Sequence, residues 1–315
     1  NHFNYKHMDI VIENLTKRFG NQKAVDNISL KVSTGEIIGF LGPNGAGKTT
    51  TMKIITNYIS ADEGRVFIGG RLVDDDPGRI KKHIGYLPEN NPLYQEMPVI
   101  DYLEFCARLH NIEKGVIGRR VAEIVRITGL NREKHKKIGE LSKGYRQRVG
   151  LAQAMIHDPE ILILDEPTSG LDPNQIAEIR KLIRELGREK TVILSTHILP
   201  EVEATCDRIF IINKGRLVAD GTPENLRTQA QGSDIVKVRI EDGDPDQIFK
   251  SLMQVRSVSL VDFTDRHMNR FEIHCRAETA KREIFNLCVS RKWVLTEMTP
   301  YEAKLEDIFR ELTMN

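Results

Sequence analysis

A glycine-rich segment near residue 45 constrains the fold of this chain more than any other feature. The segment Gly42-Pro43-Asn44-Gly45-Ala46-Gly47-Lys48-Thr49-Thr50 fits the pattern G-x-x-x-x-G-K-[ST]. It follows the apolar run Ile37–Leu41 and precedes Met52–Ile55, so it reads as strand, loop and helix. Glycines allow the backbone to approach a phosphate closely, and N–H groups at the start of a helix attract an anion. The pattern predicts a phosphate-binding loop in which Lys48 reaches the β- and γ-phosphates and Thr49 ligates Mg²⁺.

The composition indicates an ordinary globular protein of about two domains. Of its 315 residues 40% are apolar and 29% are charged, and the net charge of +1 gives no reason to expect a nucleic-acid binder. No uncharged apolar run approaches the roughly 20 residues that span a bilayer, and no signal peptide is apparent. The cysteines lack metal-binding spacing, which predicts a reducing compartment without zinc or disulfides: Cys106, Cys206, Cys275 and Cys288. No function is predicted for the seven residues before Met8.

The region after the loop predicts an α/β sheet with a helical insert. Strands are expected up to about Leu72, and helical periodicity runs from about Val99 to Met155. Short, fully apolar runs then follow, which are typical of parallel strands buried on both faces: 161–164, 191–195 and 208–213. Asp165-Glu166 and Thr196-His197 each follow such a run. Open α/β sheets bind their ligands at this end of the strands, so we expect these side chains in a site.

The last third of the chain predicts a separate small module. Its composition shifts past about Arg227, and Gln229–Ser233 is the expected linker. The order strand, helix, strand, strand, helix, strand fits a split βαβ unit, and one more helix follows: 235–240, 245–253, 258–263, 270–275, 279–291, 293–297 and 305–312. This module offers no catalytic constellation.

Two features leave alternatives open. Phe19 is either a platform on which a nucleotide base stacks or a core aromatic. The basic run Arg132–Lys137 is either a solvated face or a surface for an acidic partner loop.

Five motifs in a fixed order resemble the ATP-binding cassette of ABC transporters over roughly Asp9 to Leu226. They are the phosphate loop, Leu141-Ser142-Lys143-Gly144-Tyr145, Ile161–Glu166, Ser169–Asp172 and Thr196-His197. The resemblance implies a P-loop α/β cassette over 8–228. Such a cassette has a mostly parallel sheet core, an antiparallel β subdomain and a helical insert at about 92–157. The remaining 234–315 would form a small ferredoxin-like α+β domain.

The resemblance also implies ATP and Mg²⁺ as cofactors and gives roles to single residues. Catalysis would involve Lys48, Glu166 as general base and His197 as the switch histidine. Asp165 would hold Mg²⁺ through water, with Thr49 and Glu89 as further metal contacts. The nucleotide would be bound by Phe19, by the loop residues Gly42, Pro43, Asn44, Gly45, Ala46, Gly47, Lys48, Thr49 and Thr50, and by Ser142 and Gly144.

Two positions depart from the family pattern. Glu89 stands where a glutamine is usual, which adds a negative charge beside the γ-phosphate, although Asn90 and Asn91 are adjacent. Lys143 and Tyr145 replace the second glycine and the glutamine of the usual Leu-Ser-Gly-Gly-Gln signature. Ser142 and Gly144, the two residues that approach the phosphate, are retained, so we expect activity to persist.

In this family the signature of one subunit completes the nucleotide site of another. The implied active form is a head-to-tail homodimer, or a pseudo-dimer with a related cassette, that drives separate transmembrane permease subunits from the cytoplasmic, inner face of the membrane. The tail Trp293–Thr313 resembles exporter-type ATPases, and Gly85–Tyr94 looks most like a gliding-motility-associated subunit. The alternative is a non-transport cassette acting on ribosomes or DNA, but a single uninterrupted cassette without long heptads argues against it.

Overall fold

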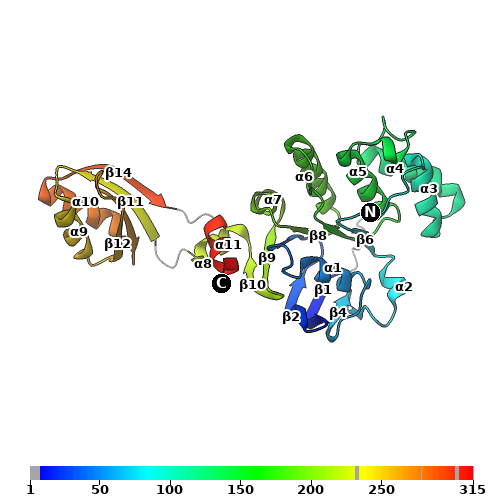
Figure 1. Ribbon diagram of the computed structural model, residues 1–315, viewed down its shortest axis with the longest axis horizontal. Coiled ribbons are helices and arrows are strands. Elements are labelled where there is room, and N and C mark those ends of the chain that lie inside the picture. The colour runs from blue at the N-terminus through cyan, green and yellow to red at the C-terminus, as the bar shows by residue number, and fades with distance from the viewer. Residues whose placement is uncertain (1–7, 231–233, 278, 302–304, 315) are drawn as a thin grey trace, which may run out of the picture. The chain divides into compact units, whose positions relative to one another are not determined.

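The computed structural model describes residues 8–230, 234–277, 279–301 and 305–314 (Figure 1). The first seven residues and part of the expected linker Gln229–Ser233 lie outside this description. Two compact units are formed, one by the described residues of Asn1–Pro223 and Leu312–Asn315, the other by those of Glu224–Glu311. Among the described residues, no helix is both long enough and apolar enough to cross a membrane.

A six-stranded sheet forms the centre of the first unit. Its strand order is β10-β9-β3-β8-β7-β6, parallel except for the antiparallel edge strand β10. The strands are β3 (Ile37–Leu41), β6 (Ile84–Leu87), β7 (Ile161–Asp165), β8 (Thr191–Thr196), β9 (Arg208–Asn213) and β10 (Arg216–Gly221). Every residue of β3, β7 and β8 is buried. The prediction of central parallel strands from fully apolar runs is therefore confirmed.

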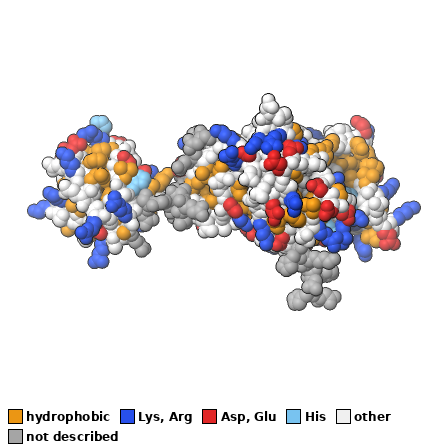
Figure 2. Space-filling view, turned by 90° about the horizontal axis from the view of Figure 1, so that it is seen from below, with side chains coloured by type: hydrophobic (Ala, Val, Ile, Leu, Met, Phe, Trp, Pro, Cys, Tyr) orange, Lys and Arg blue, Asp and Glu red, His pale blue; other side chains and the backbone are white. Residues whose placement is uncertain are grey.

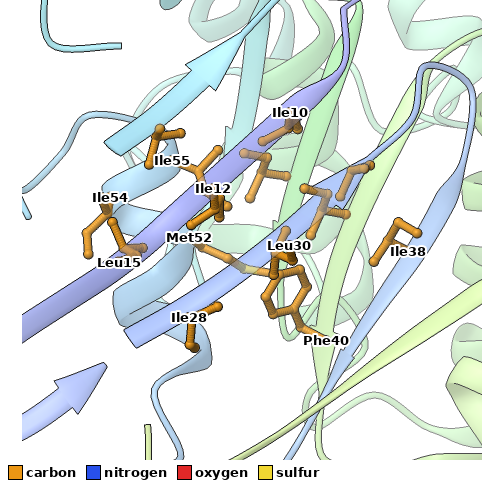
Figure 3. Close-up of a cluster of buried hydrophobic side chains, with 14 of the residues drawn as sticks. Ile10, Ile12, Leu15, Ile28, Leu30, Ile38, Phe40, Met52, Ile54 and Ile55 are labelled. Carbon is orange, nitrogen blue, oxygen red and sulfur yellow. The ribbon is translucent and has the colours of Figure 1, made fainter. Parts of the chain in front are cut away.

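An antiparallel sheet and the first helix pack against one face of this central sheet. The sheet has the order β2-β1-β4-β5 and contains β1 (Ile10–Phe19), β2 (Gln22–Val32), β4 (Glu63–Ile68) and β5 (Arg71–Leu72). Helix α1 (Lys48–Ile55) contributes Met52, Ile54 and Ile55 to the shared core (Figure 3). Phe40 enters the same core from β3 and meets Phe210 of β9 edge to face. This packing fixes α1, and with it the loop before α1, against the end of the sheet.

The remaining helices of the first unit come largely from the insert and from the connections between parallel strands. They are α2 (Pro77–Ile80), α3 (Val99–Leu109), α4 (Lys114–Ile127), a 3₁₀ turn (Ile138–Glu140), α5 (Lys143–Met155), α6 (Pro173–Gly187) and α7 (Leu199–Thr205). Helix α8 (Pro223–Ala230) follows β10. In the basic run, Lys136 pairs with Glu133 and Lys137 with Glu96, all near the surface. These two lysines have counter-charges within the chain, and the interpretation of the run as a surface for an acidic partner loop stays a prediction.

The second unit has the predicted β-α-β-β-α-β order. Its antiparallel sheet has the order β12-β13-β11-β14, with α9 and α10 sharing one core with it. The elements are β11 (Asp234–Glu241), α9 (Pro245–Met253), β12 (Val258–Asp265), β13 (Arg270–Cys275), α10 (Ala280–Arg291) and β14 (Val294–Tyr301). Helix α11 (Leu305–Met314) ends the described chain. Strand order and direction are those of a ferredoxin-like split βαβ unit.

The surface charges agree with the balanced composition. On the face of the larger unit that Figure 2 shows, Lys and Arg side chains are interspersed with Asp and Glu side chains. On that face the intermixing leaves no broad field of one sign.

Candidate functional site

The glycine-rich loop connects β3 to α1 and is shaped by close backbone contacts. A Cβ atom at Gly42 would lie 2.3 Å from the carbonyl oxygen of Ile212, and one at Gly47 would lie 2.3 Å from that of Ala24. Gly47 also has φ 108, in the left-handed region, and is the N-cap of α1. No side chain caps this helix, and its first turn carries no acidic residue. Its free N–H groups and its dipole are therefore available to an anion.

Lys48 lies inside the loop rather than extending into solvent. Its Nζ donates to the carbonyl oxygens of Gly42 at 2.7 Å and Pro43 at 3.2 Å, and it lies 3.7 Å from Oε1 of Glu166. The side chain is only 6% exposed. Burial lowers the pKa of the ammonium group, and the carboxylates of Glu166 and Asp165 oppose that shift. The ammonium group is thus held between the loop carbonyls and the Glu166 carboxylate.

Asp165 ends β7 as a fully buried carboxylate. Its Oδ1 accepts from the hydroxyl of Thr49 at 3.1 Å and from the hydroxyl of Ser195. Its Oδ2 is buried and has no hydrogen-bond partner in the part of the chain that the structure describes. An ionised carboxylate with one unpaired buried oxygen is costly unless a cation meets it. An oxygen-only donor set of carboxylate and hydroxyl is what Mg²⁺ prefers, so these residues fit that ion.

Glu166 points to a different group from its neighbour because its backbone is left-handed, with φ 48. Its N–H donates to the backbone carbonyl of Ser195 at 3.2 Å and to the Ser195 hydroxyl at 3.0 Å, which holds this strained residue in place. Its carboxylate lies 3.1 Å from Nδ1 of His197 and faces Lys48. Burial raises the pKa of Glu166 above its ordinary value of 4.5, and His197 and Lys48 oppose that shift. Glu166 is placed to accept a proton.

Glu89 lies in the loop that follows β6 and is exposed. It lines a cavity of about 400 Å³ together with Thr49 and Asp165. The structure therefore brings the three predicted metal contacts to one space, although Glu89 makes no ion pair with Lys48 among the described residues.

Phe19 ends β1 at the hairpin turn, where it pairs with Gln22 of β2. Its side chain is 55% exposed, so the core interpretation of this aromatic is wrong. Lys17 Nζ lies 5.8 Å from the ring centroid. Ala24 of the same hairpin lies close to Gly47 of the phosphate loop. The Phe19 ring therefore belongs to the strand pair that borders this loop. An exposed ring at this place can receive a base; that role remains a prediction.

Ser142 and Gly144 make their contacts away from the loop. Ser142 caps α5, accepting from the N–H of Tyr145 at 3.3 Å. Gly144 is buried, and a Cβ there would lie 2.7 Å from Cδ of Gln175 on α6. Among the described residues, neither is hydrogen-bonded to the phosphate loop. Within one chain the site is therefore assembled without the two signature residues that were predicted to bind nucleotide.

Glu201 of α7 is a site residue that was not predicted from the sequence. It is 5% exposed, and its Oε2 accepts from the hydroxyls of Thr168 at 2.7 Å and Thr196 at 3.0 Å. It thereby joins the segment after Glu166 to the residue before His197. The only hint in the sequence is an acidic residue four positions after His197, which any solvated helix could carry.

Comparisons with known proteins agree with this geometry. The family described as ABC transporter matches residues 25–169. The family described as ATP-binding protein DrrA1-3-like, C-terminal domain, matches residues 221–313.

Several curated proteins are similar over two thirds of the chain or more. The uncharacterized ABC transporter ATP-binding protein YhcH of Bacillus subtilis is 36% identical over 313 residues, covering 96% of this chain and 95% of its own. The linearmycin resistance ATP-binding protein LnrL of the same organism is 32% identical over 307 residues, covering 96% and 97%. The bacitracin transport ATP-binding protein BcrA of Bacillus licheniformis is 40% identical over 215 residues, covering 68% and 69%. A solved ATP-binding subunit of an ABC transporter superposes with a TM-score of 0.64 and 30% identity over 70% of this chain and 92% of its own.

The close backbone contact at Gly47 yields a stability prediction. We expect Gly47→Ala to lower the free energy of unfolding by more than about 2 kcal/mol, because left-handed strain adds to a clash with the Ala24 carbonyl. Gly70→Ala is the matched control, since Gly70 has φ 73 but open space around its Cβ position, and should cost about 1 kcal/mol. Denaturant unfolding of the full chain measures both. Equal costs would show that the contact with Ala24 does not shape the loop.

Proposed function

Because this chain belongs to the ATP-binding proteins of ABC transporters, we propose that two copies close head to tail on ATP and drive a separate export permease. The chain is a P-loop ATPase, and members of its family work as dimers with transmembrane permease partners. The observation that carries the proposal is the division of the site. Lys48, Asp165 and Glu166 converge at the phosphate loop, whereas Ser142 and Gly144 do not.

The hydrolytic step follows from the positions of the charged groups. The loop N–H groups and the Lys48 ammonium would stabilise the charge of the β- and γ-phosphates. A water molecule would attack the γ-phosphorus while its proton passes to the Glu166 carboxylate and the bond to ADP breaks. His197, hydrogen-bonded to Glu166, would orient that carboxylate and contact the γ-phosphate. Thr49 and Asp165 would hold Mg²⁺, which when bound supplies charge neutralisation at the phosphates.

The second copy would supply the signature residues Ser142 and Gly144 to the phosphate loop of the first. Ser142 is an exposed residue at the start of α5, two positions before Gly144. A hydroxyl and a helix N-terminus form a second anion-binding group, suited to the far side of a bound γ-phosphate. Two chains related by a twofold axis would each receive this group from the other. Nucleotide would then be enclosed between the two chains.

The exporter assignment rests on similarity and is part of the proposal. Relatives include proteins named for linearmycin resistance, bacitracin transport and Nod factor export. The match of the tail to the DrrA1-3-like domain supports the exporter type. We propose that the helical insert contacts the permease from the cytoplasmic face of the membrane. The finer proposal of a gliding-motility subunit rests only on the segment Gly85–Tyr94.

We expect Glu166→Gln to bind ATP, to lose hydrolysis and to accumulate as a dimer, because the isosteric amide keeps the packing but cannot accept a proton. Size-exclusion chromatography with light scattering, in ATP and Mg²⁺, measures the mass. Glu160→Gln is the matched control: it lies exposed at the opposite end of β7, so it should hydrolyse ATP and return to monomer. Only monomer for Glu166→Gln under saturating ATP would contradict the paired form.

The pKa of Glu166 predicts the acidic side of the pH profile. Because burial raises this pKa above 4.5, the carboxyl group protonates, and stops accepting protons, at a higher pH than an exposed glutamate. We expect kcat to fall as the pH decreases, with a midpoint above 4.5, in the wild type and in Glu160→Gln alike. Steady-state ATPase assays over the range where circular dichroism shows a folded chain test this. A kcat that stays constant down to pH 4.5 would contradict it.

A further inference from the structure

Glu201 of α7 is a buried carboxylate beside the site to which the proposed hydrolytic step gives no role. Its Oε2 accepts from the hydroxyls of Thr168 and Thr196, and its Oε1 is buried without a hydrogen-bond partner among the residues that the structure describes. Within those residues it forms no ion pair with a lysine, arginine or histidine. A buried ionised carboxylate that no cation pairs with is unfavourable for folding, and two hydroxyl donors offset only part of that cost. Stability alone therefore does not explain Glu201.

The hydrogen bonds of Glu201 lie where the ladder between β7 and β8 ends. The last residues paired in that ladder are Asp165 and Ser195. Thr168 lies three positions after Asp165, and Thr196 directly follows Ser195. Both threonine hydroxyls donate to the same oxygen, at 2.7 Å and 3.0 Å, and both side chains are buried. One carboxylate oxygen thus joins the two segments beyond the last ladder pair.

The imidazole of His197 depends on the backbone around it, because burial does not fix this side chain. It is 46% exposed, and its Nδ1 lies 3.1 Å from Oε2 of Glu166. The Thr196 hydroxyl accepts from the N–H of Ile198 at 3.0 Å while it donates to Glu201. It therefore makes contacts on both sides of His197 along the chain. Glu201 holds the hydroxyl that anchors this segment.

The Thr168 hydroxyl anchors the segment that follows the general base. Thr168 comes two positions after Glu166 and is 3% exposed. The N–H of Ser169 donates to the Glu166 carbonyl at 3.1 Å, and that of Leu171 donates to the Thr168 carbonyl at 3.2 Å. These turns join the backbone of Glu166 directly to the threonine that Glu201 binds. A displacement of Thr168 would therefore also displace Glu166.

We propose that Glu201 is a positioning residue that sets the distance between Glu166 and His197 by binding Thr168 and Thr196 with one oxygen. A misplacement of about 1 Å in a reacting group can lower a rate by about 100-fold. Among the described residues, Glu201 is not hydrogen-bonded to the phosphate loop. It therefore acts on the orientation of the base and not on the binding of nucleotide. This inference rests on the proposed function, because it requires Glu166 to be the base.

The test deletes the hydroxyls and the carboxylate separately in the full-length chain. Thr168→Val and Thr196→Val each remove one hydrogen bond to Glu201 and keep the shape of the side chain, whereas Glu201→Ala removes both bonds. Thr205→Val is the matched control: Thr205 also lies on α7 and is 4% exposed, but its hydroxyl has no partner in the described part of the chain. Steady-state assays with Mg²⁺ give kcat and the KM for ATP, and circular dichroism monitors folding.

We expect kcat to fall by about 3- to 10-fold in Thr168→Val and in Thr196→Val, and by about 10- to 100-fold in Glu201→Ala. The KM for ATP should stay within about twofold of the wild-type value, because nucleotide binding is not the affected step. Glu201→Gln keeps an acceptor oxygen and should lose less activity than Glu201→Ala. Thr168→Val should have no further effect on kcat when Glu201 is already alanine, because both changes break the same hydrogen bond.

Values of kcat for Thr168→Val and Thr196→Val equal to that of Thr205→Val would overturn the proposal. A rise in KM as large as the fall in kcat would also overturn it, because it would show general damage to the site. Additive losses in the double variant would do the same, since Thr168 would then act without Glu201. If Glu201→Ala does not fold, the single valine variants and their KM values decide. Full activity in Glu166→Gln would instead refute the proposed function at its general base, and this proposal with it.

Discussion

The fully buried carboxylate of Asp165 is the constraint on which the site depends. Removing such a charge from water is expensive, and the chain offsets this with hydroxyl donors from Thr49 of α1 and Ser195 of β8. These contacts tie the helix after the phosphate loop to two central strands. The oxygen left without a partner makes the arrangement incomplete until a cation binds. The Asp165 side chain therefore contributes both to the stability of the fold and to the binding of a cation.

Adjacent carboxylates can perform different tasks only if the backbone separates them. The left-handed conformation of Glu166 does this, directing its side chain to Lys48 and His197 while Asp165 faces the cavity. Hydrogen bonds from the Glu166 N–H to Ser195 offset the strain of that conformation. The Ser195 hydroxyl also donates to Asp165. Ser195 therefore stabilises both halves of the pair. The higher pKa of Glu166 follows from the same burial that fixes its position.

The elements and the order of the site residues could be predicted because apolar runs and glycine spacing are local properties. The buried strands β3, β7 and β8 were predictable from such runs. Edge strand β10 was not, because none of its residues is buried and it therefore lacks such a fully apolar run. The exposure of Phe19 and the bridging by Glu201 depend on which segments meet in space. The family resemblance implied that Ser142 acts on a second chain, but its place as the N-cap of α5, away from the loop of its own chain, depends on tertiary packing that no local pattern encodes.

The central claim is that each nucleotide site is shared between two chains, and mixing two inactive variants tests it most directly. Lys48→Ala removes the loop cation, and Gly144→Val blocks the approach of the signature backbone. In a mixed dimer, one site combines the intact loop of the second variant with the intact signature of the first. We expect each variant alone to lack ATPase activity and the mixture to regain it. A mixture as inactive as its components, with mixed dimers demonstrated, would contradict it.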